Sequence, residues 1–145
     1  APISVEDFLL VGRTNSPVCF IKNKKIKKDI DSALDMVGCK DLKYRKLGSL
    51  SGGELKRIEI ATVLARSTKI SIFDEPEAGI DLWSFKSLIK VFEKMHDTLG
   101  GSIIIISHQE RILNIADKIV VIANGQIQNQ GKKDEVLPKL LGVED

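Results

Sequence analysis

Apolar positions along this chain change their spacing near Leu50. Before that point, apolar residues recur three or four positions apart over 30–37, a spacing that predicts a helix. A capping-box-like start predicts another short helix over 4–10, closed by a loop that begins at Gly12. No stretch of 1–48 has the pattern of a strand, so we expect this part to be a small helical unit.

Beyond this point, helical and strand patterns alternate. Two short apolar runs, 70–73 and 103–106, predict buried strands, and the second is apolar on both faces because all its residues are isoleucine. Such a strand is typical of the interior of a parallel sheet covered by helices on both sides. Amphipathic spacing predicts a helix over 85–99 and another from Gly52 with Leu55 on its apolar, buried face, and Asn124-Gly125 predicts a hairpin turn. The expected fold class is therefore α/β.

Composition narrows the class of protein without identifying it. Hydrophobic residues make up 43% of the chain, charged residues 29%, and the formal net charge is +2, too small to indicate a nucleic-acid partner. No apolar run approaches the roughly 18 residues of a membrane helix, and the first residues lack the pattern of a signal peptide. Cys19 and Cys39 lack the spacing of metal ligands. We expect a cytoplasmic protein with reduced thiols.

A lysine-rich run over 22–28 concentrates positive charge in the first third of the chain. We expect it to form a solvated loop and the start of a helix. Contact with an acidic partner surface is the alternative.

Ser51-Gly52-Gly53 opens a predicted helix and is the first segment with candidate chemistry. Free backbone amides and the positive end of the helix dipole favour an anion at such a start. Glycines let a phosphate approach the backbone closely, and the serine hydroxyl adds a donor. By itself this pattern is often only a helix cap, so its meaning depends on the motifs further along the chain.

Asp74, Glu75 and His108 come directly after, or close after, the two predicted strands. The carboxyl ends of parallel strands share one edge of a sheet, where α/β proteins bind ligands. In a phosphoryl-transfer site, Asp74 suits holding Mg²⁺ through a water, and Glu75 suits polarising the attacking water as general base. His108 suits a donor that senses the terminal phosphate. The sequence therefore predicts a phosphoryl-transfer site at this edge.

The order and spacing of these segments resemble the ATP-binding-cassette (ABC) ATPases over roughly residues 45–131. The segment Leu50-Ser51-Gly52-Gly53-Glu54 resembles the signature motif of that family. The segment 70–75 resembles its Walker B strand, and Glu77-Ala78-Gly79-Ile80-Asp81 is similar to its D-loop. His108 resembles the switch histidine.

The resemblance implies a division of the chain and a missing part. Residues 1–48 would belong to the helical subdomain, and 49–145 to the C-terminal part of an ATPase core whose sheet carries helices on both faces. The chain contains no G-x-x-x-x-G-K-[ST] loop, so the strand that carries this loop is absent from it. We expect the intact parent to hydrolyse ATP with Mg²⁺, and this fragment to be inactive alone.

The resemblance also implies a partner, because two such ATPase subunits pack head to tail. Four signature residues of one subunit then contact the ATP held by the other: Ser51, Gly52, Gly53 and Glu54. Asp81 organises the dimer interface. On the ATP of their own subunit, Glu75 and His108 are the expected catalytic residues, and Asp74 holds the metal through a water.

Within the family, the chain is most similar to SufC, the soluble ATPase of iron–sulfur cluster assembly. Glu54 stands where transporters more often have glutamine, and the segments 56–60 and 108–113 are similar to SufC. This interpretation predicts a SufB/SufD-like scaffold as partner and no nucleic acid. The alternative, favoured by Pro76, is the nucleotide-binding subunit of a membrane transporter, peripheral to the membrane and bound to a permease. A DNA-maintenance ATPase is a third interpretation, but the chain lacks its heptads and zinc cysteines.

Overall fold

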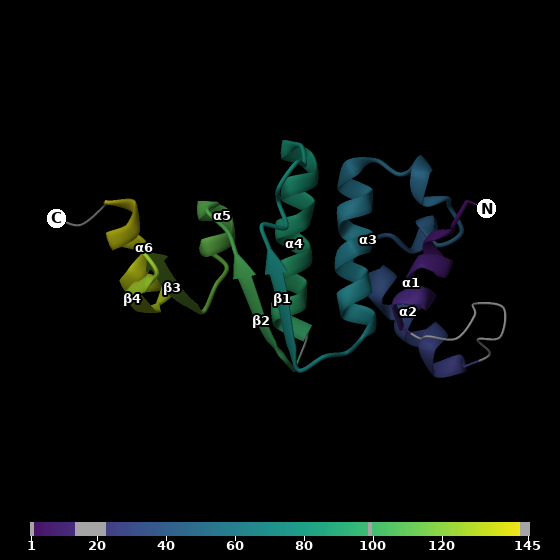
Figure 1. Ribbon diagram of the computed structural model, residues 1–145, viewed down its shortest axis with the longest axis horizontal. Helices are drawn as coiled ribbons and strands as arrows, with labels where there is room; N and C mark the ends of the chain where they lie inside the picture. Colours follow the sequence, from purple (N-terminus) through teal and green to yellow (C-terminus); the bar gives the residue numbers. More distant parts are fainter. Residues whose placement is uncertain (1, 14–22, 99, 143–145) are drawn as a thin grey trace.

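The computed structural model describes residues 2–13, 23–98 and 100–142. In Figure 1, helices from the first half of the chain stand on one side of a short parallel sheet, and a hairpin with the last helix lies on the other. None of the helices in these ranges has the length and apolar content that a bilayer span requires. In chain order the elements are α1 (Val5–Arg13), α2 (Lys24–Met36), the short 3-10 turns η2 (Lys40–Leu42) and η3 (Leu47–Ser49), α3 (Gly52–Ala65), β1 (Ile70–Asp74), α4 (Leu82–Thr98), β2 (Ser102–Ile106), α5 (Glu110–Leu113), β3 (Lys118–Ala123), β4 (Gln126–Lys132) and α6 (Lys133–Leu141).

The first helix runs further than the sequence pattern predicts. The predicted end at residue 10, with a loop from Gly12, is wrong, since α1 continues through Gly12 to Arg13. Gly12 lies against α3, where an added Cβ would be 3.0 Å from Thr62 Cγ2, and its carbonyl accepts a hydrogen bond from Arg66 Nε at 3.0 Å. This contact with α3 supports the last turn of α1. The rest of the predicted loop, 14–22, lies outside the described residues.

The helix predicted over 30–37 is confirmed as the second half of α2. The Asn23 side chain caps α2 by accepting hydrogen bonds from the first backbone amides. Lys43, which follows η2, joins the two N-terminal helices: its Nζ lies 2.7 Å from Asp31 Oδ1 and 3.7 Å from Glu6 Oε1. The buried side chains of α2 are Ile30, Ala33 and Leu34.

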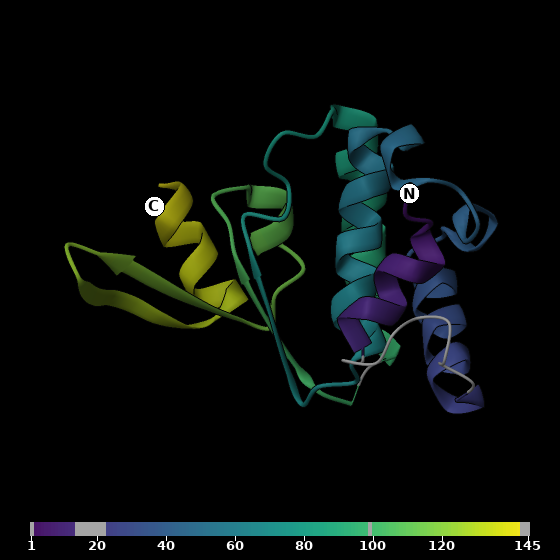
Figure 2. The same cartoon turned by 45° about the vertical axis from the view of Figure 1, so that its right-hand side comes forward.

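The third helix is enclosed by neighbours on two sides. It contacts α1 and α2 on one side and α4 on the other (Figure 2). The expected buried position at Leu55 is wrong, because that side chain is 37% exposed. With neighbours on two sides, the buried positions do not follow a single stripe: they are Gly53, Ile58, Ile60, Ala61 and Ala65.

The two apolar runs form a parallel pair, β1 and β2, with Ile72 opposite Ile104 in the register. The α/β class is confirmed. One face of the pair packs on α4, where the rings of Phe73 and Phe92 meet edge to face at 5.3 Å between centroids. The prediction that strand 103–106 is covered on both faces is not met, because no described helix packs on the other face. Four isoleucines remain about half exposed there: Ile70, Ile72, Ile104 and Ile106.

The predicted hairpin is confirmed in β3 and β4, which pair antiparallel. Both turn residues, Asn124 and Gly125, have the positive φ values that a tight hairpin turn favours. One face of the hairpin packs on α6 around Ile119, Val136 and Leu137, which form a second, smaller core.

A contact at the surface connects α4 with the chain segment that leads into this hairpin. His96, near the end of α4, has its Nε2 2.9 Å from both carboxylate oxygens of Asp117. Its Nδ1 lies 3.2 Å from Asp97 Oδ1. Hydrogen bonding to Asp117, and then to Asp97, raises the pKa of the His96 imidazole.

Candidate functional site

The segment Ser51–Glu54 forms a complete capping box at the start of α3. Ser51 Oγ accepts a hydrogen bond from the Glu54 amide at 3.2 Å, and Glu54 Oε2 accepts one from the Ser51 amide at 2.8 Å. This second bond is the main reason that the pKa of the Glu54 carboxyl is lowered. The amides of Gly52 and Gly53 have no acceptor in the described part of the chain, as expected for a first helical turn. Both amides are free to donate to an anion, with Gly52 exposed and Gly53 buried.

Gly53 lies against the first turn of α4. A Cβ built on it would be 2.0 Å from Ser84 Oγ and 2.6 Å from Ser84 Cβ, so no larger residue fits without movement. Ser84 Oγ in turn donates to Asp81 Oδ2 at 2.8 Å. Asp81 also accepts from the amides of Trp83 and Ser84, and the Ser84 amide is the main reason that the pKa of Asp81 is lowered. The signature segment and Asp81 are therefore joined through one serine.

Asp74, Glu75 and His108 lie at the carboxyl edge of β1 and β2. Asp74 is opposite Ile106 in the register, and the Glu75 amide extends the ladder by donating to the Ile106 carbonyl at 2.9 Å. Glu75 has a left-handed backbone with φ of 44°, an uncommon conformation for a residue with a side chain. Its Oε1 lies 3.4 Å from His108 Nε2. Both side chains are open to solvent and to an incoming ligand.

A second polar pair supports this edge, and the sequence reasoning did not single it out. Ser107 Oγ donates to Glu77 Oε1 and also accepts from the Gln109 amide at 3.0 Å. The other carboxylate oxygen, Glu77 Oε2, is buried with no hydrogen-bond partner in the described residues. The pair joins the turn after β1 to the turn after β2, which holds His108. Its only sequence signal was the position of Glu77 at the start of the D-loop-like segment.

The predicted site residues thus form two groups. One is the signature segment with Asp81, and the other is Asp74, Glu75 and His108. Figure 1 places the start of α3 and the ends of both strands toward the same, upper end of the molecule. Among the described residues, no hydrogen bond or ion pair joins the two groups. No cluster of three or more potential metal ligands occurs among those residues either. Beside phosphates, Mg²⁺ is commonly bound by only one or two protein carboxylates, and Asp74 offers one.

Comparison with known proteins bears on the family to which the chain belongs. The family model described as ABC transporter matches residues 4–78. The spermidine/putrescine import ATP-binding protein of Bacteroides fragilis is 38% identical over 107 residues, which are 73% of this chain and 23% of that protein. The energy-coupling factor transporter ATP-binding protein of Enterococcus faecalis is 34% identical over 136 residues, covering 92% of this chain and 46% of its own length.

Solved structures match over nearly the whole chain. The protein cbiO1 of Clostridium perfringens, part of the ABC transporter complex cbiONQ, superposes with a TM-score of 0.84 at 30% identity, covering 99% of this chain and 56% of that one. The ADP conformation of an ATP-binding cassette of an ABC transporter gives a TM-score of 0.80 at 28% identity. The chain therefore spans about half the length of these relatives, and less of some. With this match to the family model and to the relatives, the chain belongs to the ABC transporter ATPase family.

Proposed function

We propose that this chain is the signature-bearing part of the ATP-hydrolysing subunit of a membrane ABC transporter. The observation that carries the proposal is the pairing of Glu75 with His108, 3.4 Å apart, beside Asp74 at the carboxyl edge of the sheet. The relatives named as import and energy-coupling ATP-binding proteins support the assignment to a transporter. The expected partners are a second ATPase subunit and a membrane permease, with this subunit on the cytoplasmic side.

Within its own subunit, the edge would serve water attack on ATP. Glu75 would accept a proton from the attacking water, and His108 would donate to the terminal phosphate while holding the Glu75 carboxylate in place. Asp74 would hold Mg²⁺ through a water, where the ion neutralises phosphate charge. The left-handed backbone at Glu75 turns the chain sharply at the end of β1 and presents its carboxylate at the rim.

Across the dimer, the start of α3 would meet the ATP of the other subunit. The free amides of Gly52 and Gly53 supply donors there, and the capping box keeps Ser51 and Glu54 in fixed positions. Asp81 is held by Ser84 against the same helix start, so a movement of Asp81 at the dimer interface would also move the signature segment. The chain has no phosphate-binding lysine loop, so alone it is expected to hydrolyse no ATP.

An iron–sulfur assembly ATPase of the SufC type is the second candidate. The specific feature that favours it is Glu54, whose carboxylate closes the capping box on the Ser51 amide. A glutamine there could make the same bond without the charge, so only the charge of Glu54, and not the capping bond, favours the second candidate. The relatives named above are transporter subunits, and we therefore rank the transporter first.

The hydrolysis mechanism is tested by Glu75→Gln in the longest natural polypeptide that contains this chain. Loss of a general base should lower ATP turnover by roughly a hundredfold or more, while binding of MgATP stays within about twofold. Glu93→Gln, which neutralises an exposed carboxylate on α4, is the matched control and should change neither. Turnover that survives Glu75→Gln would contradict the assigned role.

The partner is tested separately by affinity capture of the same polypeptide from solubilised cells. Recovery of an integral membrane permease supports the transporter. Recovery of a soluble SufB/SufD-like scaffold instead would establish the second candidate.

A further inference from the structure

The start of α2 carries a cluster of positive charges that form no ion pair with the described residues. Four exposed lysines, Lys24, Lys25, Lys27 and Lys28, occupy its first five positions, and we call them the lysine patch. With about 100° between successive residues of a helix, they span an arc of about 160°. The buried side chains of α2 point to the opposite side.

This arrangement works against the helix that carries it. Positive charge in a first turn opposes the helix dipole, and lysines three or four positions apart repel one another. Capping is supplied by Asn23 instead, whose Oδ1 accepts from the amides of Lys25 at 2.9 Å and Ile26 at 3.4 Å. The patch therefore contributes nothing to capping.

The carboxylates that could neutralise the patch are engaged elsewhere. Asp29, four residues after Lys25, lies 2.9 Å from Arg13 Nη2. Asp31, four residues after Lys27, lies 2.7 Å from Lys43 Nζ. No ion pair to the patch occurs in the described residues, and the segment 14–22 before it contains no Asp or Glu.

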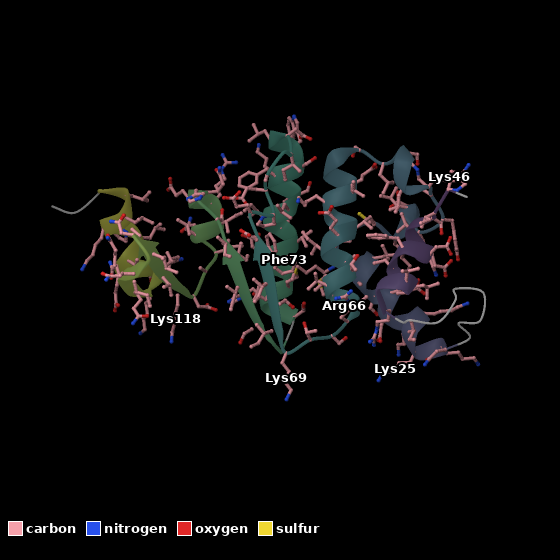
Figure 3. The ribbon with its side chains drawn as sticks, viewed as in Figure 1. Lys25, Lys46, Arg66, Lys69, Phe73 and Lys118 are labelled. Carbon is pink, nitrogen blue, oxygen red and sulfur yellow. The ribbon has the colours of Figure 1, made fainter. Side chains whose placement is uncertain are left out.

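Other basic groups lie toward the same end of the molecule. Figure 3 shows the labelled side chains of Lys25, Arg66 and Lys69 along the lower edge, and both ribbon views place the starts of α2 and β1 at this end. Arg66 and Lys69 are exposed. Two acids, Asp97 near the end of α4 and Asp117 just before β3, are engaged by hydrogen bonds to His96. The start of α3 and the carboxyl ends of β1 and β2 are at the opposite end (Figure 1).

We propose that the lysine patch binds the anionic headgroups of a phospholipid membrane surface. Lysines are flexible point charges that suit a diffuse negative surface, whereas stereospecific recognition favours arginine. The residues of α2 include no aromatic side chain on which nucleic-acid bases could stack. The choice of a membrane over another polyanion rests on the proposed function as a transporter subunit.

The test is flotation of the longest natural polypeptide that contains this chain with lipid vesicles. Vesicles of phosphatidylcholine alone are compared with vesicles containing roughly 30% phosphatidylglycerol, at low and physiological salt. The patch variant changes all four lysines to Gln. The matched control makes the same change of net charge at four exposed lysines elsewhere: Lys40, Lys46, Lys90 and Lys94.

Each lysine of a cluster at an anionic surface changes partitioning by about fivefold, so the patch variant should bind at least tenfold more weakly at low salt. The wild type and the control should float with anionic vesicles only, and salt should release them. The proposal is overturned if the control variant loses as much vesicle binding as the patch variant. It is also overturned if the wild type binds neutral vesicles as well as anionic ones. Wild-type binding to RNA or polyglutamate, lost in the patch variant, without binding to vesicles would overturn it as well. Because flotation needs no ATP turnover, its failure is distinguishable from failure of the Glu75→Gln test.

Discussion

Gly53→Ala is the substitution for which the structure gives the sharpest expectation. The added methyl group would lie 2.0 Å from Ser84 Oγ and 2.6 Å from Ser84 Cβ. The hydroxyl cannot simply rotate away without losing its bond to Asp81, and the Ser84 Cβ is fixed to the backbone of α4. The helix starts of α3 and α4 must therefore move apart.

The magnitude is set by two opposing effects. Alanine in place of glycine favours a helix by up to about 1 kcal/mol. Overpacking of this kind costs about 1–3 kcal/mol, and contacts with backbone-fixed atoms belong at the upper end of that range. We expect a net loss of about 2 kcal/mol in the free energy of unfolding. Gly52→Ala is the matched control, because nothing lies within 4 Å of its added Cβ. It should be neutral or slightly stabilising.

Urea unfolding of the natural polypeptide measures the stability change of both variants, Gly53→Ala and Gly52→Ala, as a shift of the midpoint at constant slope. Double variants then identify the contact. Ser84→Ala removes only the hydroxyl and should relieve part of the cost of Gly53→Ala, whereas Ser84→Gly removes both close atoms and should relieve nearly all of it. If Gly53→Ala and Gly52→Ala prove equally stable, the close approach of α3 and α4 at Gly53 is refuted.

Three further predictions concern groups whose titration the structure perturbs. The pKa of Glu54 is lowered in the folded state, so its bond to Ser51 stabilises the protein at pH values above the unfolded pKa near 4.5. This stabilisation is lost as the pH falls through the lower folded pKa. Glu54→Gln should therefore flatten the acidic part of the plot of unfolding free energy against pH, measured by urea unfolding. The pKa of His96 is raised in the folded state, so its pairing with Asp117 stabilises the protein fully at pH values below the unfolded pKa of about 6.5. This stabilisation is lost as the pH rises through the higher folded pKa. An NMR titration of the imidazole should show this upward shift, and Asp117→Asn should reduce it; an unshifted titration in the wild type would contradict the pairing. Cys39 is fully buried and its thiol pKa is raised by desolvation, so it should react with a thiol reagent only as fast as the protein opens, and rapid labelling of the folded protein would contradict its burial.

The sequence determined those features that depend on residues a few positions apart. The periodic apolar side chains of 85–99 predict α4 because a helix brings such positions onto one face. Asn124-Gly125 predicts the hairpin because both residues tolerate positive φ. The capping-box-like start of the first helix likewise needs only one turn of chain, and the Asp7 amide donates to Ser4 Oγ at 3.1 Å. The identities of the candidate site residues were also available, since their motifs are contiguous.

Only the tertiary structure decided which distant segments meet. The apolar run 103–106 was compatible with burial on both faces, yet one face is open because only α4 packs on the sheet in the described chain. Leu55 fitted a helical stripe but is exposed, because α3 is enclosed from two other directions. The contact of Gly53 with Ser84, and the pair formed by Ser107 and Glu77, each join residues about 30 positions apart. Such contacts depend on how whole elements pack, and local propensity carries no information about that packing.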